Sequence, residues 1–408
     1  MSYELGEGKK LTFPSVGYNS LRVIHLGKYY PPAFGGIETH TQALAQAQAA
    51  LGAEVSVVVV NHADKTGRDV TFAATASTPT VCDDDGPVKV YRVGRVANLA
   101  KLDFTPGLPS LLRKLLRNPP DIWHLQTPNA TMLLSLAAMP AIRPLVVTHH
   151  SDMIRQKLLK YAVLPVERLV YSRAAKLLSD SPPYIDGSAS LSKYRSKVET
   201  LPLGLDLRPF QSPSSAARTF AETIRRKYPG PLWLSVGRLI YYKALDIALK
   251  ALKDVPGTLI VVGTGPMEAQ WRQLAADLGV SQRVVWQGRA PTDELVGLYH
   301  AATALWFPSN ARSEGYGLVQ VEAMACGCPV LNANIPHSGV PWVSRHDETG
   351  LTVPIDDAPA FATAARRLLD EPGLRDRLSS EARRQAGERF DHRALAVASL
   401  QVYREVIG

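Results

Sequence analysis

The sequence predicts a two-domain α/β protein in which each half folds around a mostly parallel sheet. A chain of 408 residues, 46% of them hydrophobic, is long enough and apolar enough for two domains of about 200 residues, each with its own core. In both halves, short runs that are apolar on both faces alternate with helical stretches. Such runs are typical of buried parallel strands, and their alternation with helices is typical of a doubly wound sheet.

In the first half, β-branched runs predict six strands. A long alanine-rich stretch without proline, residues 37–51, predicts the helix between the first two strands. The strands are expected at residues 22–26, 55–60, 88–93, 121–126, 144–150 and 176–181.

The second half repeats this order, so we expect two Rossmann-like halves in tandem. Helices are expected at residues 243–253 and 268–279 and in the stretch after Ser313. Strands are expected at residues 232–239, 258–265, 283–288, 304–309, 328–335 and 349–355.

The domain boundary is expected in residues 201–215, which are rich in Pro, Gly and Ser. The first domain then covers 21–205 and the second 206–391. Residues 1–20 lack the apolar core of a signal peptide and are expected to form a mobile tail. The helical stretch 392–408 either ends the second domain or returns to complete the first.

Cysteine content and apolar run length favour a cytoplasmic protein. Cys82, Cys326 and Cys328 are too few for a disulfide framework and lack the spacing of a zinc site. The longest apolar stretch, residues 132–142, is shorter than the ~20 residues that cross a bilayer. Residues 82–86, with three Asp before Gly, are interpreted as a solvated turn. We therefore expect no metal requirement and no cofactor.

The net charge of +9 lies mainly in the first half, where residues 1–200 hold 23 Lys and Arg against 16 Asp and Glu. Cations alternate with apolar residues in two segments, 108–118 and 152–178. Such segments can lie on an anionic membrane, which would place the protein at the inner face of the plasma membrane. Alternatively, they are ordinary helices that cover the sheet. A nucleic-acid partner is disfavoured because no helix-turn-helix, zinc-finger or RNP pattern occurs.

The segment after the predicted strand 304–309 combines glycines with two glutamates. Gly317 precedes a helix that begins near Leu318, where unsatisfied peptide N–H groups could meet a phosphate or a sugar hydroxyl. Glu314 stands before this turn and Glu322 eight positions later. Both could face a crevice at the carboxyl end of the sheet, or they could be two solvated glutamates on a helix.

Two cations follow the first strand of the second half. Arg238 ends this strand, and Lys243 stands at the predicted start of a helix five residues later. A guanidinium and an ammonium near a helix N-terminus suit a diphosphate. The alternative is a solvated loop with two charges. Gly263 and Gly265 follow the next strand, where a Gly-x-Gly sequence alone indicates little more than a tight turn.

In the first half, Gly35 and Gly36 precede the first helix, where backbone can approach a phosphate closely. Glu38 could instead be an ordinary first-turn acid. His150 ends a strand where a crevice is expected, and a histidine there can bind a sugar hydroxyl or move a proton. Asp152 could orient it or receive the proton of the acceptor.

His149 is the less favoured of the two adjacent histidines. His124 is interpreted as structural or as a residue on the acceptor side.

The segment that contains Glu314 and Glu322, residues 308–331, resembles the signature of the retaining GT-B glycosyltransferases of family 4 (glycosyl transferases group 1). The resemblance extends from about residue 22 to the C-terminus. It implies two Rossmann-like domains whose parallel sheets face each other across a cleft. The donor would be a nucleotide-sugar.

The resemblance also implies roles for these residues. Glu314 would contact the donor sugar and Glu322 the ribose. Arg238 and Lys243 would neutralise the leaving diphosphate, and His150 would lie near the sugar. Five further residues and the start of the helix at Gly317 and Leu318 would surround the nucleotide: Gly35 and Gly36 at the phosphates, Gly263 and Gly265 beside the nucleotide, and Arg289 near the base. One departure is Ala244, where the family usually has Gly, although a methyl group should be tolerated on a helix.

Residues 335–354 resemble those of bacterial polysaccharide mannosyl- and rhamnosyltransferases. The resemblance implies a hexosyltransferase that retains the anomeric configuration, with GDP-mannose as the first expected donor and UDP-sugars next. A lipid-linked saccharide in cell-surface polysaccharide synthesis is the expected acceptor. The alternatives are a nucleotide-sugar epimerase of the same architecture and a non-catalytic glycosyltransferase-like partner subunit.

Overall fold

The computed structural model describes residues 2–5, 9–12, 21–33, 35–71, 73–99, 102–152 and 157–408. The chain divides into two compact units: Met1–Leu205 together with His392–Gly408, and Asp206–Asp391. The C-terminal helix α15 (His392–Ile407) therefore belongs to the first unit. No helix in the described part of the chain is both long and apolar enough to cross a bilayer.

The first unit is built on an eight-stranded sheet with the order β12-β11-β10-β9-β3-β4-β6-β5. All neighbouring strands are parallel except β5 and β6 at one edge. The strands are β3 (Arg22–Leu26), β4 (Glu54–Val60), β5 (Val81–Asp85), β6 (Val88–Val93), β9 (Ile122–Thr127), β10 (Leu145–His149), β11 (Lys176–Ser179) and β12 (Val198–Thr200). The chain enters at β3 in the middle of the sheet, and the order reverses between β3 and β9.

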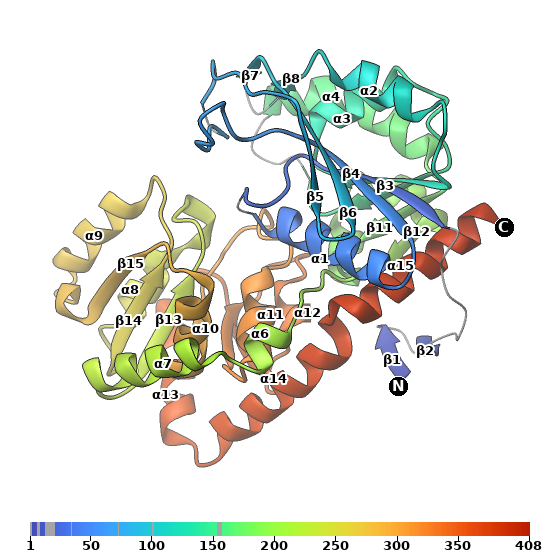
Figure 1. Cartoon of the computed structure of the whole chain (residues 1–408). Coiled ribbons are helices and arrows are strands. Elements are labelled where there is room, and N and C mark those ends of the chain that lie inside the picture. The colour runs from blue at the N-terminus through green and yellow to red at the C-terminus, as the bar shows by residue number, and fades with distance from the viewer. Residues whose placement is uncertain are drawn as a thin grey trace. The chain divides into compact units, whose positions relative to one another are not determined.

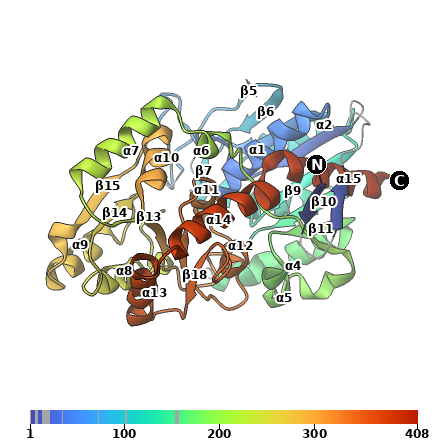
Figure 2. The same cartoon turned by 90° about the horizontal axis from the view of Figure 1, so that it is seen from below.

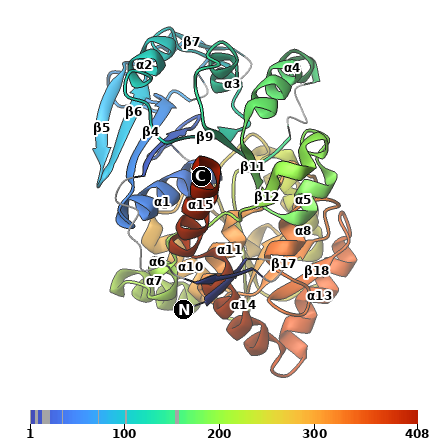
Figure 3. The ribbon, with the colours of Figure 1, turned by 90° about the vertical axis from the view of Figure 1, so that its right-hand side faces the viewer.

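Helices cover both faces of this sheet (Figure 1). On one face α1 (Gly36–Ala50) and α15 pack side by side, and their apolar residues join those of the strands in one core cluster. On the other face lie α2 (Leu108–Leu115), α3 (Ala130–Ala137) and α4 (Lys157–Arg173), with a second cluster that includes Leu112, Met132 and Val170. Figure 3 shows α15 lying across the sheet beside α1.

One prediction for the first half, the solvated turn at residues 82–86, is wrong. Residues 82–86 are not a solvated turn, because Cys82–Asp85 belong to β5, which forms an antiparallel hairpin with β6. Within this hairpin, Asp83 pairs with Arg92, and Asp85 accepts a hydrogen bond from the hydroxyl of Tyr30.

In the predicted tail, β1 (Ser2–Leu5) pairs with β2 (Lys9–Thr12). Residues 1, 6–8 and 13–20 lie outside the described residues.

The second unit contains a six-stranded, fully parallel sheet with the order β15-β14-β13-β16-β17-β18. All six strands fall within the predicted segments: β13 (Leu232–Val236), β14 (Thr258–Val262), β15 (Val284–Gly288), β16 (Ala304–Phe307), β17 (Val330–Ala333) and β18 (Gly350–Val353). The order reverses between β13 and β16. In open α/β sheets such a reversal opens a crevice at the carboxyl ends of the strands, where ligands bind.

Two helical layers enclose this sheet (Figure 2). Helices α8 (Leu245–Ala251), α9 (Glu268–Asp277) and α13 (Ala358–Asp370) pack on one face and share a core with the strands. The opposite layer contains α7 (Ser215–Lys227), α10 (Thr292–Ala301), α11 (Leu318–Ala325) and α14 (Leu374–Phe390). The sheet thus presents the loops after β13 and β16 at its reversal point.

Candidate active site

The loops after β13 and β16 bring the predicted charged residues of the second unit together. Lys243 ends a short 3-10 turn after β13, and Glu314 lies in the loop between β16 and α11. The Lys243 Nζ and the Glu314 Oε2 form an ion pair of 2.6 Å, with side chains only 17% and 11% exposed. The Ser309 hydroxyl donates to the same carboxylate oxygen at 3.3 Å. The cation expected at a diphosphate is thus paired with the acid expected at the sugar.

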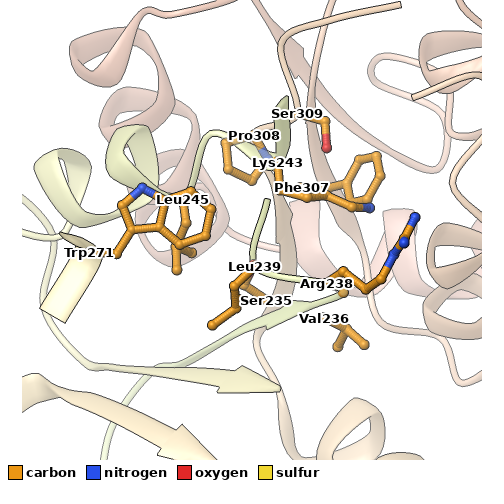
Figure 4. Close-up of a pocket in the computed structure, with 11 residues that line it drawn as sticks. Ser235, Val236, Arg238, Leu239, Lys243, Leu245, Trp271, Phe307, Pro308 and Ser309 are labelled. Carbon is orange, nitrogen blue, oxygen red and sulfur yellow. The ribbon is translucent and has the colours of Figure 1, made fainter. Parts of the chain in front are cut away.

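A small pocket surrounds the Lys243 ammonium (Figure 4). Its Nζ lies 4.6 Å from the centroid of the Phe307 ring, a cation–π contact that fixes the alkyl stem. The cavity of about 10 Å³ has room for about one water molecule. Its lining consists of Ser235, Val236, Gly237, Arg238, Leu239, Lys243, Leu245, Trp271, Phe307, Pro308 and Ser309. A diphosphate therefore cannot bind within it and would have to meet Lys243 from the open side.

Arg238 lies exposed beside this pocket. Burial and the Glu314 charge raise the pKa of the nearby Tyr242 hydroxyl to about 12, against the opposing effect of Arg238. Tyr242 therefore stays protonated at neutral pH, and its hydroxyl can donate as well as accept. Arg238, Tyr242 and Lys243 together offer donors to an anion at the carboxyl end of β13.

Hydrogen bonds to the following segment fix the loop that carries Glu314. The Ser338 hydroxyl donates to the Glu314 carbonyl at 2.6 Å, and the Gly339 N–H donates to the Gly315 carbonyl at 2.8 Å. These bonds hold the main chain after the Glu314 Cα, and the Glu314 N–H, which donates to the Ala311 carbonyl at 2.9 Å, holds the main chain before it. The carboxylate position is therefore set by the backbone as well as by its partner Lys243.

Gly317 is required at the start of α11. Its φ of 78° lies in the left-handed region, and a Cβ there would lie 2.6 Å from the Phe307 Cζ. The chain can therefore turn against Phe307 and begin α11 at Leu318 only with glycine here. The first N–H groups of α11 face away from the helix body, as a phosphate or sugar hydroxyl would require.

Glu322 lies in α11, partly buried, and accepts a hydrogen bond of 2.7 Å from the Tyr299 hydroxyl. Burial raises the pKa of Glu322, whereas the Tyr299 bond opposes that rise. Additional donors would stabilise its charged form. The two hydroxyls of a ribose are donors of this kind. Among the described residues, no hydrogen bond or ion pair joins Glu322 to Lys243 or Glu314.

The glycines after β14 shape the Arg238 loop. A Cβ on Gly263, whose φ is 131°, would lie 2.0 Å from the Gly237 carbonyl oxygen, and one on Gly265 would lie 2.3 Å from the Leu239 carbonyl oxygen. Both residues therefore let two strand-end loops pack backbone to backbone. Arg289 is exposed just after the edge strand β15, two strands away from β13.

Ala244 needs a correction to the reasoning from sequence. It does not lie on a helix, because it precedes α8 with φ 46° and ψ 40°, a left-handed conformation. A side chain there costs about 1–2 kcal/mol relative to the right-handed conformation. The Ala244 methyl is buried in the core and recovers part of this cost. Glycine adopts this left-handed backbone without that cost, which is a physical reason for glycine at this position.

In the first unit, Gly35 and Gly36 lie exposed at the start of α1. The Glu38 carboxylate folds back over Gly35, where a Cβ would lie 1.9 Å from its Oε2. The His40 ring, one turn further along α1, lies 6.0 Å from the His150 ring. The start of α1 and the end of β10 thus meet at the carboxyl end of this sheet.

His150 is held by side chains from both neighbouring strands. Its Nδ1 lies 3.0 Å from the Asp180 Oδ1 after β11, and its Nε2 lies 2.8 Å from the Gln126 Oε1 on β9. Asp152 was expected to orient it, but this is wrong. Asp152 pairs with the Nε2 of His149 at 3.0 Å, because adjacent residues at a strand end point to opposite faces.

His124 is fully buried and hydrogen-bonded, which agrees with its structural interpretation.

Several cations of the basic segments have internal partners. Arg173 donates to carbonyls at the end of α3, and Lys176 pairs with Glu199. The side chains of Arg155, Lys157 and Lys160 lie outside the described residues. On α2, Leu108 and Leu112 are buried, while the cations of residues 113–117 are exposed. Of the two basic segments, α2 is therefore the one whose exposed cations the structure shows.

Sequence reasoning missed five residues that shape these sites: Gln126, Asp180, Tyr242, Tyr299 and Ser309. Gln126, Asp180 and Ser309 lie in the last residue or two of a predicted strand segment, a signal that could have found them. Tyr299 reaches Glu322 only through the tertiary fold, whereas Tyr242 stands directly before Lys243 in the sequence. Among the described residues, no group of three or more His, Cys, Asp or Glu side chains could hold a metal ion.

Comparison with protein families gives two matches that together span most of the chain. Residues 219–385 match "Glycosyl transferases group 1", and residues 35–204 match "Glycosyl transferase 4-like domain". The O-antigen chain mannosyltransferase C of Escherichia coli is 30% identical over 93% of this chain and 98% of its own. The D-rhamnosyltransferase WbpZ of Pseudomonas aeruginosa is 30% identical over 86% of this chain and 87% of its own.

The name of a third, less similar relative includes its sugar donor. The GDP-mannose-dependent α-(1-6)-phosphatidylinositol monomannoside mannosyltransferase of Mycobacterium tuberculosis is 27% identical over 85% of this chain and 89% of its own. Among solved structures, sucrose-phosphate synthase from Thermosynechococcus elongatus superimposes with a TM-score of 0.77 at 22% identity. That match covers 94% of this chain and 98% of the synthase. At this identity the likeness concerns the fold.

Proposed function

The chain belongs to the glycosyl transferases of group 1, and we propose that it moves a mannosyl group from GDP-mannose to a lipid-linked saccharide during polysaccharide synthesis. Transfer of a sugar is the activity for which the family is named. Mannose is favoured over rhamnose because two of the three relatives above are named mannosyltransferases. GDP is favoured because one of them is named for it.

The observation that carries this proposal is the Lys243–Glu314 pair at the reversal point of the second sheet. Breaking the sugar–phosphate bond leaves negative charge on the diphosphate, which fixed cations stabilise most where water is excluded. Lys243 and Arg238 supply those cations at the end of β13. A sugar hydroxyl that donates to the Glu314 carboxylate would free Lys243 for the diphosphate.

We further propose that transfer retains the anomeric configuration and needs no metal ion. In such a front-face reaction the acceptor oxygen bonds to the anomeric carbon on the side that the diphosphate leaves. The departing phosphate oxygen takes the acceptor proton. The main work of the protein is then to stabilise the leaving group and to exclude water, through Arg238, Lys243 and the start of α11. Activity that persists in excess EDTA, with an α-linked product by NMR, is the expected result.

A nucleotide panel tests the donor. We expect GDP and GDP-mannose to raise the unfolding temperature, whereas UDP, ADP and their sugar conjugates leave it nearly unchanged. A ligand at 100 times its dissociation constant adds about 2.7 kcal/mol of stability. This corresponds to a shift of about 5–10 °C for a unit of this size. Differential scanning fluorimetry measures it. Stabilisation by UDP-sugars alone would reject GDP-mannose, and no response to any nucleotide would favour a non-catalytic partner subunit.

The acceptor side of the proposal concerns a surface on the first unit. Apolar side chains are exposed on or beside the hairpin of β7 (Ala97–Leu99) and β8 (Leu102–Phe104): Val96 is 56% exposed, Leu99 64% and Phe104 45%. The exposed cations Arg113, Lys114 and Arg117 follow on and after α2. We propose that this surface contacts anionic lipid on the cytoplasmic side of a membrane, where a lipid-linked acceptor resides.

Vesicle binding tests this contact. Each cation near an anionic surface contributes about 1 kcal/mol, so Arg113→Ala with Lys114→Ala should weaken binding about 30-fold. Flotation with vesicles of phosphatidylcholine and phosphatidylglycerol measures the change. The matched control is Arg226→Ala with Lys227→Ala, which removes two exposed cations from α7 of the second unit. Equal loss in both variants would contradict a specific surface.

A further inference from the structure

A hydrogen bond links two helices of the second unit at the carboxylate of Glu322. The Tyr299 hydroxyl, near the end of α10, donates to the Glu322 Oε2 on α11 at 2.7 Å. The Tyr299 side chain is fully buried, whereas Glu322 is only partly buried. Tyr299 therefore holds the carboxylate from the inside of the protein and leaves its outer side to solvent or to a ligand.

Tyr299 is itself fixed by α6 (Arg208–Gln211), the first helix of the second unit. The Phe210 ring packs edge-on against the Tyr299 ring at a centroid distance of 6.3 Å, and the neighbouring His300 Nε2 donates to the Phe210 carbonyl at 2.8 Å. Helix α6 also packs against α11, and Figures 1 and 2 show α6, α10 and α11 close together. The Tyr299 hydroxyl is therefore a fixed point against which the carboxylate is held.

The proton of this hydrogen bond stays on the tyrosine. Burial and the Glu322 charge raise the pKa of Tyr299 well above its usual value, so its hydroxyl remains a donor at neutral pH. Burial raises the pKa of Glu322 as well, and the hydrogen bond from Tyr299 opposes that rise. Without this bond, the carboxylate would be harder to keep charged and free to turn.

No second donor of comparable strength reaches Glu322 among the described residues, where its carboxylate has no other hydrogen bond and no ion pair. Cys326 stands one turn later, at the end of α11, and the Glu322 charge contributes to the raised pKa of its thiol. A thiol is only a weak donor, and the described structure contains no hydrogen bond from it to the carboxylate. Loss of the Tyr299 hydroxyl would therefore not be compensated.

We propose that Tyr299 is a positioning residue for nucleotide recognition: its hydroxyl holds the Glu322 carboxylate where it accepts hydrogen bonds from the two hydroxyls of a ribose. A carboxylate has about four acceptor positions, so one tyrosine leaves enough of them for both hydroxyls. The site then selects ribonucleotides over nucleotides that lack these hydroxyls. This inference rests on the proposed function, since it needs a nucleotide-sugar donor in the second unit.

Ribose discrimination tests this role. The affinities of the full chain for GDP and for 2′,3′-dideoxy-GDP are measured by isothermal titration calorimetry, in the wild type and in Tyr299→Phe, which keeps the buried ring. In the wild type, loss of the two ribose hydroxyls should weaken binding about 10-fold or more, because hydrogen bonds to a charged group are lost. In Tyr299→Phe, GDP should bind about 10-fold more weakly, whereas the affinity for dideoxy-GDP should not change.

A double variant and a matched control separate positioning from packing. If Tyr299 acts through Glu322, then Tyr299→Phe combined with Glu322→Ala should bind GDP no more weakly than Glu322→Ala alone. The control Tyr228→Phe removes a hydroxyl at the end of α7 and should leave both affinities unchanged.

A further variant keeps the test open if Tyr299→Phe does not fold. Glu322→Asp retains the charge, but its side chain is shorter by one methylene and should not reach both Tyr299 and a ribose. It should therefore discriminate between the two nucleotides much less than the wild type, although it still carries a carboxylate.

Three results would overturn the inference: an equal loss of affinity for both nucleotides in folded Tyr299→Phe, full discrimination in folded Glu322→Asp, or no discrimination in the wild type. Each leaves nucleotide binding itself intact, so each differs from a failure of the proposed function. If GDP does not bind to the wild type, the proposed donor is wrong, and UDP with its dideoxy analogue decides the role of Tyr299. If neither nucleotide binds, the inference fails together with the proposed function.

Discussion

Replacing Lys243 with methionine is expected to lower kcat for sugar transfer about 10²- to 10³-fold. Loss of one preorganised donor at a developing negative charge has an effect of this size in other enzymes. Methionine keeps an unbranched side chain that can pack on the Phe307 ring, so the variant removes the charge rather than the packing. A radiolabelled-donor assay at saturating substrate measures kcat. The KM for the donor should change less, because the diphosphate gains its additional negative charge only as the sugar–phosphate bond breaks.

Lys250→Met is the control for this experiment. Lys250 also forms an ion pair with an acid, the 2.9 Å contact with Asp246 on α8, but both residues are partly exposed on the helix surface. That variant should keep almost full activity, since an exposed pair of this type contributes about 0.3–0.5 kcal/mol. If Lys243→Met retains more than one tenth of wild-type kcat, Lys243 does not stabilise the leaving group.

The Lys243–Glu314 pair also predicts coupling between the two residues. Either single substitution leaves the other charge buried without its main partner, which costs about 1–3 kcal/mol of unfolding free energy. The double variant Lys243→Met with Glu314→Gln leaves neither charge. Its destabilisation should therefore be smaller than the sum of the two single effects.

The fold could be predicted because its signals are local. Parallel strands buried on both faces produce apolar runs such as that of β4, and the twelve predicted strands all coincide with observed ones. The GT-B prediction is confirmed by the family matches and by the structural likeness. Two strands of the first sheet were missed, the edge strands β5 and β12; β5 was missed because its exposed Asp83 and Asp84 carry no apolar pattern, and β12 is only three residues long. An edge strand paired on one side does not need such a pattern.

The site was only partly predictable, because its contacts join distant segments. The charged residues could be located, since a residue at the carboxyl end of a strand faces the ligand side of the sheet. Their partners could not. That Lys243 pairs with Glu314, or that Asp180 rather than Asp152 holds His150, depends on strand order and on the face to which each side chain points. The prediction that Ala244 lies on a helix was wrong for another reason: nothing in the local sequence showed that its backbone is left-handed.

The Gly263→Ala substitution is expected to have the largest effect on stability, a loss of about 3 kcal/mol or more in the unfolding free energy of the second unit. The new Cβ would lie 2.0 Å from the Gly237 carbonyl oxygen, and backbone on both sides leaves no flexible side chain to yield. A φ of 131° adds conformational strain for any side chain. Urea unfolding followed by tryptophan fluorescence measures the loss. The Arg238 loop must shift to relieve the clash, so donor binding should weaken as well.

Gly279→Ala separates the clash from the backbone strain. Gly279 also has a positive φ, of 70°, but a Cβ there would meet nothing within 4 Å. This control should lose only about 1 kcal/mol, the cost of placing alanine in a left-handed conformation. The difference between the two variants is then the contribution of close packing between the loops after β13 and β14. Equal losses would mean that this backbone contact is not tight, and Gly263 would then serve only the turn.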